Sequence, residues 1–435
     1  MKKDIKILAI ETSCDETSAA VICGTNYSTR YNNQDTITKQ ISKSNNQYPI
    51  ILSNVVSSQI DLHAKTGGVV PEVASRAHME AIIPVIEEAL VVGRGESGVG
   101  GISLKLPTPD ALLLTDITHI AVTAGPGLIG SLLVGFNTAK SLAYALDIPI
   151  VLVNHIEGHI YSAMSGARYN NQDTITKQFP ILALTVSGGH TSLTLMRDHG
   201  KYETIGQTRD DAAGEAFDKV AKLLDLGYPG GPAVSKLADK YREGGELGVG
   251  SVERRIKNPL HPTPCTLPLI LPRPMINDKS FDFSFSGLKT AVLDVVRQLE
   301  SPTKLRIKQN YEITNGTNQR VNQLTIDQKS EICAAFEDAA VDVLVTKTLR
   351  AAQKYQPKAV ILAGGVAANK RLREQLTKEL KNLKTEEQVE LNLLVPPINL
   401  CGDNAAMIGL AAYYHILRGD VSSWDKISID SNLAL

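Results

Sequence analysis

The sequence predicts a mixed α/β fold made of two similar lobes with a cleft between them. The chain has 435 residues, which is more than one hydrophobic core usually serves. Strand-like runs of β-branched residues alternate with segments of helical periodicity, as in sheets covered by helices. A strand–turn–strand pattern opens the first half and recurs near the middle of the chain, which indicates a duplication.

The first half begins with two apolar runs joined by a polar turn at 11–17, which we interpret as a hairpin. Further β-branched runs continue the sheet, and apolar residues at helical spacing lie between them. The expected strands span 5–10, 18–22, 50–56, 117–123 and 148–153, and the expected helices span 74–90 and 128–146.

The second half repeats this plan. The expected strands span 181–186, 192–196 and 359–362, and the expected helices span 332–353 and 404–417. The last helix is expected to return to the first lobe, since chain ends often lie near one another. We therefore predict a first lobe of residues 1–178, completed by 405–435, and a second lobe of residues 179–404.

Several polar or Gly- and Pro-rich stretches interrupt the pattern and are expected to be inserted loops. They lie near 26–49, 93–112, 165–178, 244–268 and 301–325. Two of them contain the same eleven residues, at Arg30–Gln40 and Arg168–Gln178. Two copies make no solenoid, so we interpret them as surface loops, with a docking peptide as the alternative.

The composition is that of an ordinary globular protein, with 43% hydrophobic and 21% charged residues. The net charge of −1 gives no global basic field for nucleic acid, so any RNA contact must be local. Five cysteines without a CxxC pair indicate neither a disulfide framework nor a cysteine zinc site. No secretion signal or membrane-length apolar run is evident, and we expect a cytoplasmic protein without a membrane partner.

The stretch His155-Ile-Glu-Gly-His159 follows a predicted strand, and Asn154 stands where a helix would begin. Histidines at i and i+4 share one helix face and could bind one metal ion, provided a third ligand comes from elsewhere. The register is not the His-Glu-x-x-His of zinc proteases, and we interpret Glu157 as the partner of Asn154 in a capping box. The first helical turn should keep both rings neutral. The alternative is a pair of polar histidines on an exposed turn.

Three glycine-containing turns follow predicted strands. Gly125–Gly130 matches G-x-G-x-x-G but lacks the acid of a dinucleotide site after the next strand, so a tight strand-to-helix turn is the preferred interpretation. Ser187–Thr191 fits either a hairpin turn or a phosphate-binding backbone. Ala363–Asn369 suits close approach of a nucleoside, with Asn369 available to bind it.

Two acidic positions have competing interpretations. Asp403 precedes the last helix and could be its N-cap, or it could supply the missing metal ligand if the lobes close on each other. Glu215 and Asp218 are three residues apart on one face of an acid-rich helix start, where most of the other charges should be solvated.

Together these motifs resemble one family over nearly the whole chain. In order, they are IETSCDETSAAV, GGVVPEVASRAH, TAGPGLIGSLLVG, HIEGH, VSGGHT, DDAAGEAFDK, YPGGP, FSFSGLKT, AGGVAAN and GDNAAMI. The chain resembles the universal family of tRNA threonylcarbamoyladenosine transferases, whose bacterial member is TsaD and which was once mislabelled a glycoprotease. The resemblance implies a duplicated actin/Hsp70-like ATPase (RNase H-like) fold.

The resemblance also implies an activity. The threonylcarbamoyl group of threonylcarbamoyl-adenylate would pass to N6 of the adenosine at tRNA position 37, 3′ of the anticodon in tRNAs reading ANN codons, and AMP would leave. An ATP-dependent small-metabolite kinase of the same superfamily is the main alternative, and a non-catalytic subunit that presents tRNA is another. Implied partners are tRNA, a paralogous dimerisation subunit and a P-loop ATPase (TsaB- and TsaE-like).

Site residues carry over by motif. One divalent ion per subunit, iron or zinc, would be held by His155, His159 and Asp403. The acyl-adenylate would face Thr185, Val186, Ser187, Gly188 and Gly189, and its nucleoside would be bound by Asp218, Gly231 and Asn369. A Lewis-acid metal would stabilise charge on the attacked carbonyl. Asp15 and Glu16 are candidates for the base, with solvated turn acids as the alternative, and the basic stretch Lys370–Lys384 is a candidate tRNA surface.

Overall fold

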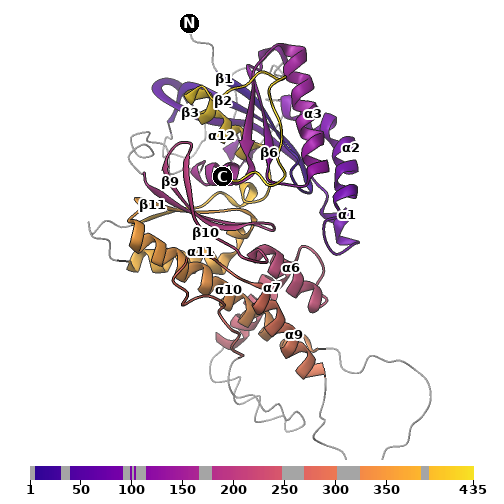
Figure 1. Ribbon diagram of the computed structural model, residues 1–435, viewed down its shortest axis with the longest axis vertical. Helices are drawn as coiled ribbons and strands as arrows, with labels where there is room; N and C mark the ends of the chain where they lie inside the picture. The colour runs from indigo at the N-terminus through magenta and orange to yellow at the C-terminus, as the bar shows by residue number, and fades with distance from the viewer. Residues whose placement is uncertain are drawn as a thin grey trace, which may run out of the picture.

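A computed structural model shows the chain as two lobes stacked on one another (Figure 1). It describes residues 5–30, 40–91, 98–99, 102–103, 114–165, 179–246, 269–300, 324–383 and 391–435. The expected insertions at 93–112, 165–178, 244–268 and 301–325 lie mainly outside these ranges, as do both copies of the repeated undecapeptide.

Two five-stranded sheets with the same strand order form the lobes. In each, three antiparallel strands are continued by two parallel strands beside the first. The first sheet runs β3 (Gln40–Ser58), β2 (Glu16–Arg30), β1 (Ile5–Glu11), β6 (His119–Gly125), β7 (Ile150–Asn154). The second runs β10 (Lys201–Gln207), β9 (Thr191–Asp198), β8 (Ile181–Val186), β11 (Ala359–Ala363), β12 (Asn392–Leu394). This repeat confirms the expected duplicated actin/Hsp70-like α/β fold.

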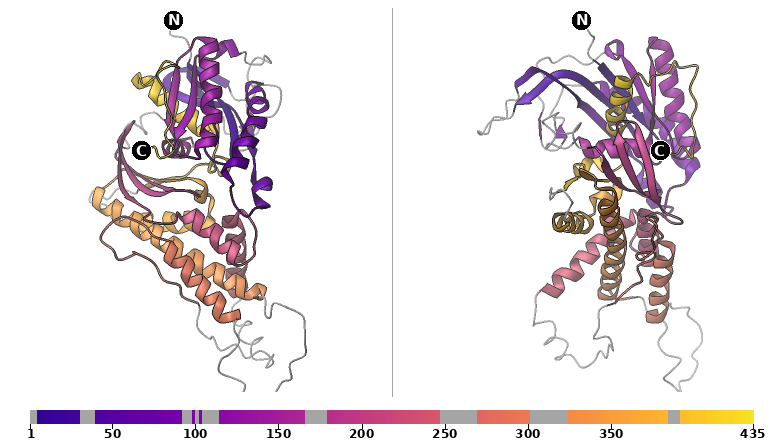
Figure 2. Two further views of the ribbon diagram at one scale, coloured as in Figure 1. Left: turned by 45° about the vertical axis from the view of Figure 1, so that its right-hand side comes forward. Right: turned by 60° about the vertical axis from the view of Figure 1, so that its left-hand side comes forward.

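Helices cover both sheets and separate them (Figure 2). They are α1 (Ile60–Ala64), α2 (Pro71–Leu90), α3 (Ile129–Leu146), α4 (His155–Met164), α6 (Ala213–Leu223), α7 (Gly230–Glu246), α9 (Ser286–Glu300), α10 (Ile326–Tyr355), α11 (Lys370–Asn382) and α12 (Ala405–Arg418). Short elements complete the described set: β4 (Gly98–Val99), β5 (Ile102–Ser103), η1 (Leu114–Asp116), η2 (Gly365–Ala368) and η3 (Ile398–Leu400). Among the described helices, none is long and apolar enough to cross a membrane.

Alternate residues of a strand point to opposite faces of its sheet. Both faces of the first sheet are covered by other elements, so both sets of side chains are buried. Leu8 and Ile10 of β1 join a cluster with residues of α2 and α3. Ile7 and Ala9 face the other way and join a cluster with α4, α12 and the second sheet. This pattern explains why residues 7–10 of β1 form a continuous apolar run rather than an alternating one.

Helices α4 and α12 lie between the two sheets. Their residues share one buried cluster with Ile7 of the first sheet and with Ala183 and Ile361 of the second. Gly158 lets the helices approach closely, since a Cβ there would lie 2.9 Å from Ile408 Cδ1. The motif of the two histidines therefore sits where the lobes are packed together.

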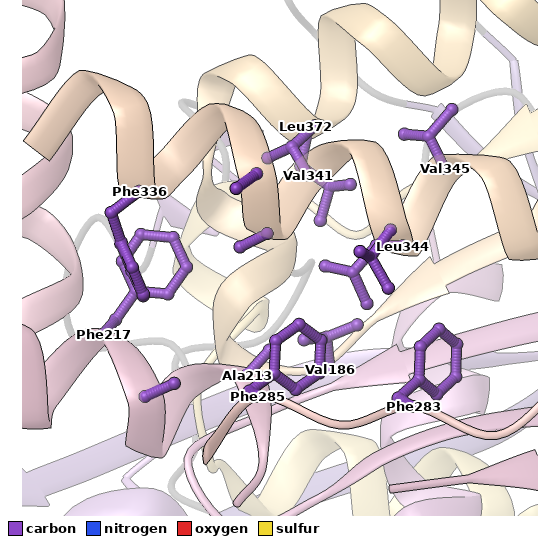
Figure 3. Packing of buried hydrophobic residues seen from close by; sticks show 14 of the residues in the cluster. Val186, Ala213, Phe217, Phe283, Phe285, Phe336, Val341, Leu344, Val345 and Leu372 are labelled. Carbon is purple, nitrogen blue, oxygen red and sulfur yellow. The ribbon is translucent and has the colours of Figure 1, made fainter. Parts of the chain in front are cut away.

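The second lobe has its own core beneath α10 (Figure 3). Phe336, Val341 and Leu344 of α10 face Val186 of β8 and Phe217 of α6. Each such buried side chain contributes about 1.5–3 kcal/mol of burial free energy. The long helix begins six residues before the expected 332, because Thr325 and Gln328 form a capping box there.

Segments near both ends of the chain are joined to the first lobe. The expected loop at 26–49 is largely a hairpin, since β2 and β3 remain paired out to Arg30 and Gln40. At the other end, α12 packs on β1 and β2, and the segment after it bonds to the first lobe through Ser422 and Asp430. A Cβ at Gly125 would collide with the Asp430 carbonyl oxygen, so the G-x-G-x-x-G stretch is a tight turn built around this C-terminal segment.

Candidate metal centre between the lobes

The helix that carries both histidines starts where the sequence predicted. Asn154 caps α4, with its Oδ1 accepting hydrogen bonds from the backbone N–H groups of Ile156 (2.8 Å) and Glu157 (3.4 Å). The predicted capping box is wrong in its second half. Glu157 is 3% exposed and its carboxylate oxygens contact Tyr202 and His415 instead of returning to Asn154.

Three side chains converge at this end of α4. His155 Nε2 and His159 Nε2 lie 3.5 Å and 3.2 Å from Asp403 Oδ1. One ligand atom from each of the three residues lies within 4.8 Å of the others. Asn404, not Asp403, caps α12, because Asn404 Oδ1 accepts the Met407 N–H at 3.1 Å. The capping interpretation of Asp403 is therefore wrong, and its carboxylate is available to a metal.

His159 provides the test of whether these residues fit a metal ion. The side chain is fully buried, and neither ring nitrogen has a hydrogen-bond partner among the described residues. Its 3.2 Å approach to Asp403 therefore lacks the alignment of a hydrogen bond. A buried nitrogen without a partner costs free energy, and a metal ion shared with Asp403 would satisfy it. The donor set of two imidazoles and one carboxylate suits iron or zinc.

The charges around His155 differ from the expectation. Burial lowers the pKa of His155, but the carboxylates of Asp403 and Glu11 outweigh burial and raise it to about 9. Burial likewise opposes ionisation of Asp403, yet the two neighbouring rings hold its pKa well below the usual range. The two carboxylates thus act against the expectation that the helix N-terminus keeps the His155 ring neutral. The same negative charge would favour a bound cation.

The acids of the first hairpin lie beside this centre. Asp15 is 7% exposed, and Tyr228 Oη of the second lobe lies 3.5 Å from its Oδ2. Glu16 accepts a hydrogen bond from Ser58 Oγ at 3.2 Å. Burial, and then the charges of Asp403 and Asp15, raise the pKa of Glu16 to about 10. These residues are not the solvated turn acids of the alternative interpretation.

The turn after β8 faces the centre from the second lobe. Ser187 and His190 close a hairpin turn through N–H···O contacts of 2.8 Å and 3.1 Å. A Cβ added at Gly188 or Gly189 would meet no described atom within 4 Å, so the turn has open space beside it. The His190 ring lies 6.2 Å from that of His155, between centroids.

Two of the expected substrate residues have fully buried side chains. The Val186 side chain packs in the second-lobe core (Figure 3). Thr185 is fully buried, and its Oγ1 has no hydrogen-bond partner in the described part of the chain. Among the described residues of this segment, open space lies beside Gly188 and Gly189 of the turn that follows them.

The expected nucleoside residues lie farther into the second lobe. Asp218 accepts the Gly230 N–H at 2.7 Å, and Gly231 next to it has open space where a Cβ would be. Asn369 caps α11 through the Leu372 N–H at 2.8 Å and donates to Glu337 Oε1 at 2.7 Å. Asn369 thus has a structural role already.

Three further charged residues are engaged with neighbours. Glu215 pairs with Lys219 at 2.8 Å, on the surface of α6. In the basic stretch of α11, Arg371 binds Asp338 at 3.1 Å and Arg373 donates to backbone carbonyls. Both arginines are therefore partly committed within the protein.

Comparison with known proteins decides the family. The TsaD model, described as tRNA N6-adenosine threonylcarbamoyltransferase, matches residues 50–95 and 109–410. The chain belongs to the TsaD family. A relative of that name from Listeria welshimeri is 42% identical over 98% of this chain and 95% of its own length. Another from Geobacillus thermodenitrificans is 42% identical over 97% of this chain and 96% of its own.

A solved structure also matches, but weakly. YeaZ from Pseudomonas aeruginosa is 15% identical, covers 46% of this chain and 64% of its own, and has a TM-score of 0.24. Membership of the TsaD family rests on the sequence matches, and it disfavours the kinase alternative.

Two residues near the centre of this TsaD-family chain were missed in the sequence. Glu11 is fully buried, and its Oε2 lies 3.2 Å from His155 Nδ1. His190 is held close to the histidine pair, and burial together with those rings lowers its pKa to about 4. A charged residue directly after the apolar run of residues 7–10 is the signal that could have drawn attention to Glu11.

Proposed function

We propose that the chain transfers the threonylcarbamoyl group from threonylcarbamoyl-adenylate to N6 of adenosine 37 in tRNAs reading ANN codons, releasing AMP. Membership of the TsaD family supports the reaction class. The observation that carries the assignment to this site is the convergence of His155, His159 and Asp403, with the buried nitrogens of His159 unbonded among the described residues.

One divalent ion, iron or zinc, would be held by these three residues. When bound, it would act as a Lewis acid on the carbamoyl carbonyl and stabilise negative charge in the transition state. Glu11 would keep the His155 ring oriented with Nε2 toward Asp403, since an outer carboxylate of this kind fixes the tautomer of a ligand.

The second lobe would hold the acyl-adenylate. The open turn at Ser187, Gly188 and Gly189 offers backbone groups close to the centre without side chains in the way. Asp218 and Gly231 would hold the nucleoside beyond it, and Asn369 would shape that end of the site as the cap of α11. The buried side chains of Thr185 and Val186 would hold this turn in place.

The acceptor amine must lose a proton, and we propose Asp15 as its acceptor. Glu16 lies next to it, but its raised pKa keeps it protonated at neutral pH. Two adjacent carboxyl groups rarely both ionise, so Glu16 would serve as a hydrogen-bond donor. AMP departs as a stable anion and needs no strong acid.

Partners follow from the same assignment. tRNA would be the acceptor, in the cytoplasm, and a paralogous dimerisation subunit and a P-loop ATPase would act with the chain. An exposed apolar stripe supports a protein partner: Met79 and Ile83 of α2 are 62% and 54% exposed, and Ile129 and Leu133 of α3 are 52% and 43% exposed. Met79→Glu with Ile83→Glu should abolish co-purification of the paralogue, while retention of binding would place the interface elsewhere.

The direct test combines purified chain, synthetic threonylcarbamoyl-adenylate and an unmodified tRNA transcript, with and without the partner proteins. Modified adenosine, measured by mass spectrometry of tRNA digests, should accumulate with the transcript and not with one carrying guanosine at position 37. No modified adenosine under any combination would overturn the proposal.

A further inference from the structure

Glu157 is a buried carboxylate in the first turns of the helix that carries both proposed ligands. It is 3% exposed and lies between His155 and His159 in sequence, and its carboxylate oxygens are bound by Tyr202 and His415. Burying a carboxylate is costly unless it is well hydrogen-bonded. The proposed metal centre does not explain why a carboxylate is buried at this position.

Both oxygens of Glu157 are bound, each by a different element. Oε1 accepts a hydrogen bond from Tyr202 Oη at 2.6 Å, and Tyr202 belongs to β10 of the second lobe. Oε2 lies 2.8 Å from His415 Nε2, and His415 belongs to the last turn of α12. Because a carboxylate only accepts, the ring nitrogen is the donor.

These contacts show how α4 crosses α12. The two histidines of α4 meet Asp403, just before α12 begins, and Gly158 packs against Ile408 in its second turn. Glu157 meets His415 at the far end of the same helix. The first turns of α4 are thus held on α12 from both sides, and a rotation of α4 would move both ring nitrogens relative to Asp403.

We propose that Glu157 is a positioning residue for the metal centre. Through His415 it sets the orientation of α4 on α12, and therefore the spacing of His155 and His159 from Asp403. Its hydrogen bond with Tyr202 also holds the first turn of α4 against the second lobe. That lobe carries the turn at Ser187, Gly188 and Gly189 that we propose to bind substrate. This inference rests on the proposed metal site, and it assigns to Glu157 no contact with metal or substrate.

Co²⁺ binding to the purified chain tests this role, because both the affinity and the visible spectrum of bound Co²⁺ report ligand geometry. Glu157→Ala should weaken Co²⁺ binding about tenfold, the lower end of the range for groups that orient metal ligands. It should also alter the d–d absorption bands. The matched control is Glu337→Ala, which removes another buried carboxylate, 1% exposed and hydrogen-bonded by Arg242 and Asn369, in the second lobe. The control should leave Co²⁺ affinity and spectrum unchanged.

Two milder variants keep the test decisive if Glu157→Ala does not fold. His415→Gln retains a donor for Glu157 and should bind Co²⁺ like the parent, whereas His415→Leu should reproduce the loss. Equal affinity and spectrum in His415→Leu and the parent would overturn the inference and leave the metal site intact. No Co²⁺ binding by the parent chain would instead overturn the proposed metal site.

Discussion

Glu11 Oε2 lies 3.2 Å from His155 Nδ1, and the carboxylate is fully buried. Its two oxygens accept hydrogen bonds from Thr123 Oγ1 and from the Ser13 N–H, both at 2.5 Å. Ser13 Oγ also contacts Nδ1, at 3.1 Å. The carboxylate therefore fixes the ring so that Nε2 points toward Asp403, which is the arrangement usual around histidines that bind metals.

Replacing this carboxylate should weaken the metal centre. We expect Glu11→Gln to reduce Co²⁺ or Zn²⁺ affinity by about 10–100-fold, because the amide holds the His155 tautomer less strongly. Competition with a chromophoric chelator measures the dissociation constant. Glu72→Gln, an exposed carboxylate paired with Arg76 on α2, is the control and should have no effect. An unchanged metal affinity in Glu11→Gln would show that Glu11 does not orient His155 for metal binding.

His159 should matter only when metal is present. Its ring nitrogens have no hydrogen-bond partner among the described residues, but the ring lies 3.2 Å from Asp403 and helps to hold that carboxylate ionised. These two effects oppose each other, so His159→Leu should change the stability of the metal-free protein by no more than about 1–2 kcal/mol. The rise in melting temperature on adding Zn²⁺, which reports binding to the folded state, should disappear. Thermal unfolding with and without Zn²⁺ measures both effects. A large loss of stability in the metal-free variant would mean that the ring has a structural partner.

Two adjacent glycines give a matched test of the turn after β11. Gly364 has φ +89°, and a Cβ there would lie 2.4 Å from the Val186 carbonyl oxygen, whereas a Cβ at Gly365 would meet no described atom within 4 Å. Gly364→Ala should cost about 1–3 kcal/mol from backbone conformation alone, and more from the clash. Gly365→Ala should be nearly neutral. Denaturant unfolding measures the free energy of unfolding of both variants. Equal values for the two would contradict the structure.

The half-buried ring of His199 should make stability depend on pH. Burial lowers the pKa of His199 to about 4, while the ring stacks on Tyr414 with centroids 4.0 Å apart and lies 2.7 Å from Tyr161 Oη. Between pH 4 and about 6.5 the unfolded chain binds more protons at this site than the folded one, so stability falls as the pH falls through that window. His199→Phe should flatten this part of the unfolding free-energy profile. An identical profile in the variant would show that His199 titrates normally.

Local patterns predicted much of this structure. β-branched runs located most strands, and the spacing of His155 and His159 placed two of the three proposed ligands on one helix face. Asp403 and Asn404 are adjacent and both are good N-caps, so no local rule could decide which one caps α12. The long pairing of β2 and β3 was missed because its outer residues are polar and do not alternate.

Contacts between distant parts of the chain could not be predicted. Glu11 meets His155 across 144 residues, and Glu157 meets Tyr202 and His415 across 45 and 258 residues. Asn154 and Glu157 satisfy the local pattern of a capping box, yet burial between the lobes gives Glu157 other partners. Such side chains respond to tertiary packing, which overrides local preference.

The most direct test of the account is the metal dependence of tRNA modification. Chelator-stripped protein, threonylcarbamoyl-adenylate, partner proteins and tRNA should yield almost no modified adenosine. Adding one equivalent of Fe²⁺ or Zn²⁺ should restore the product in the parent chain and not in a chain with His155→Ala. Full modification by the stripped protein would contradict the role assigned to His155, His159 and Asp403.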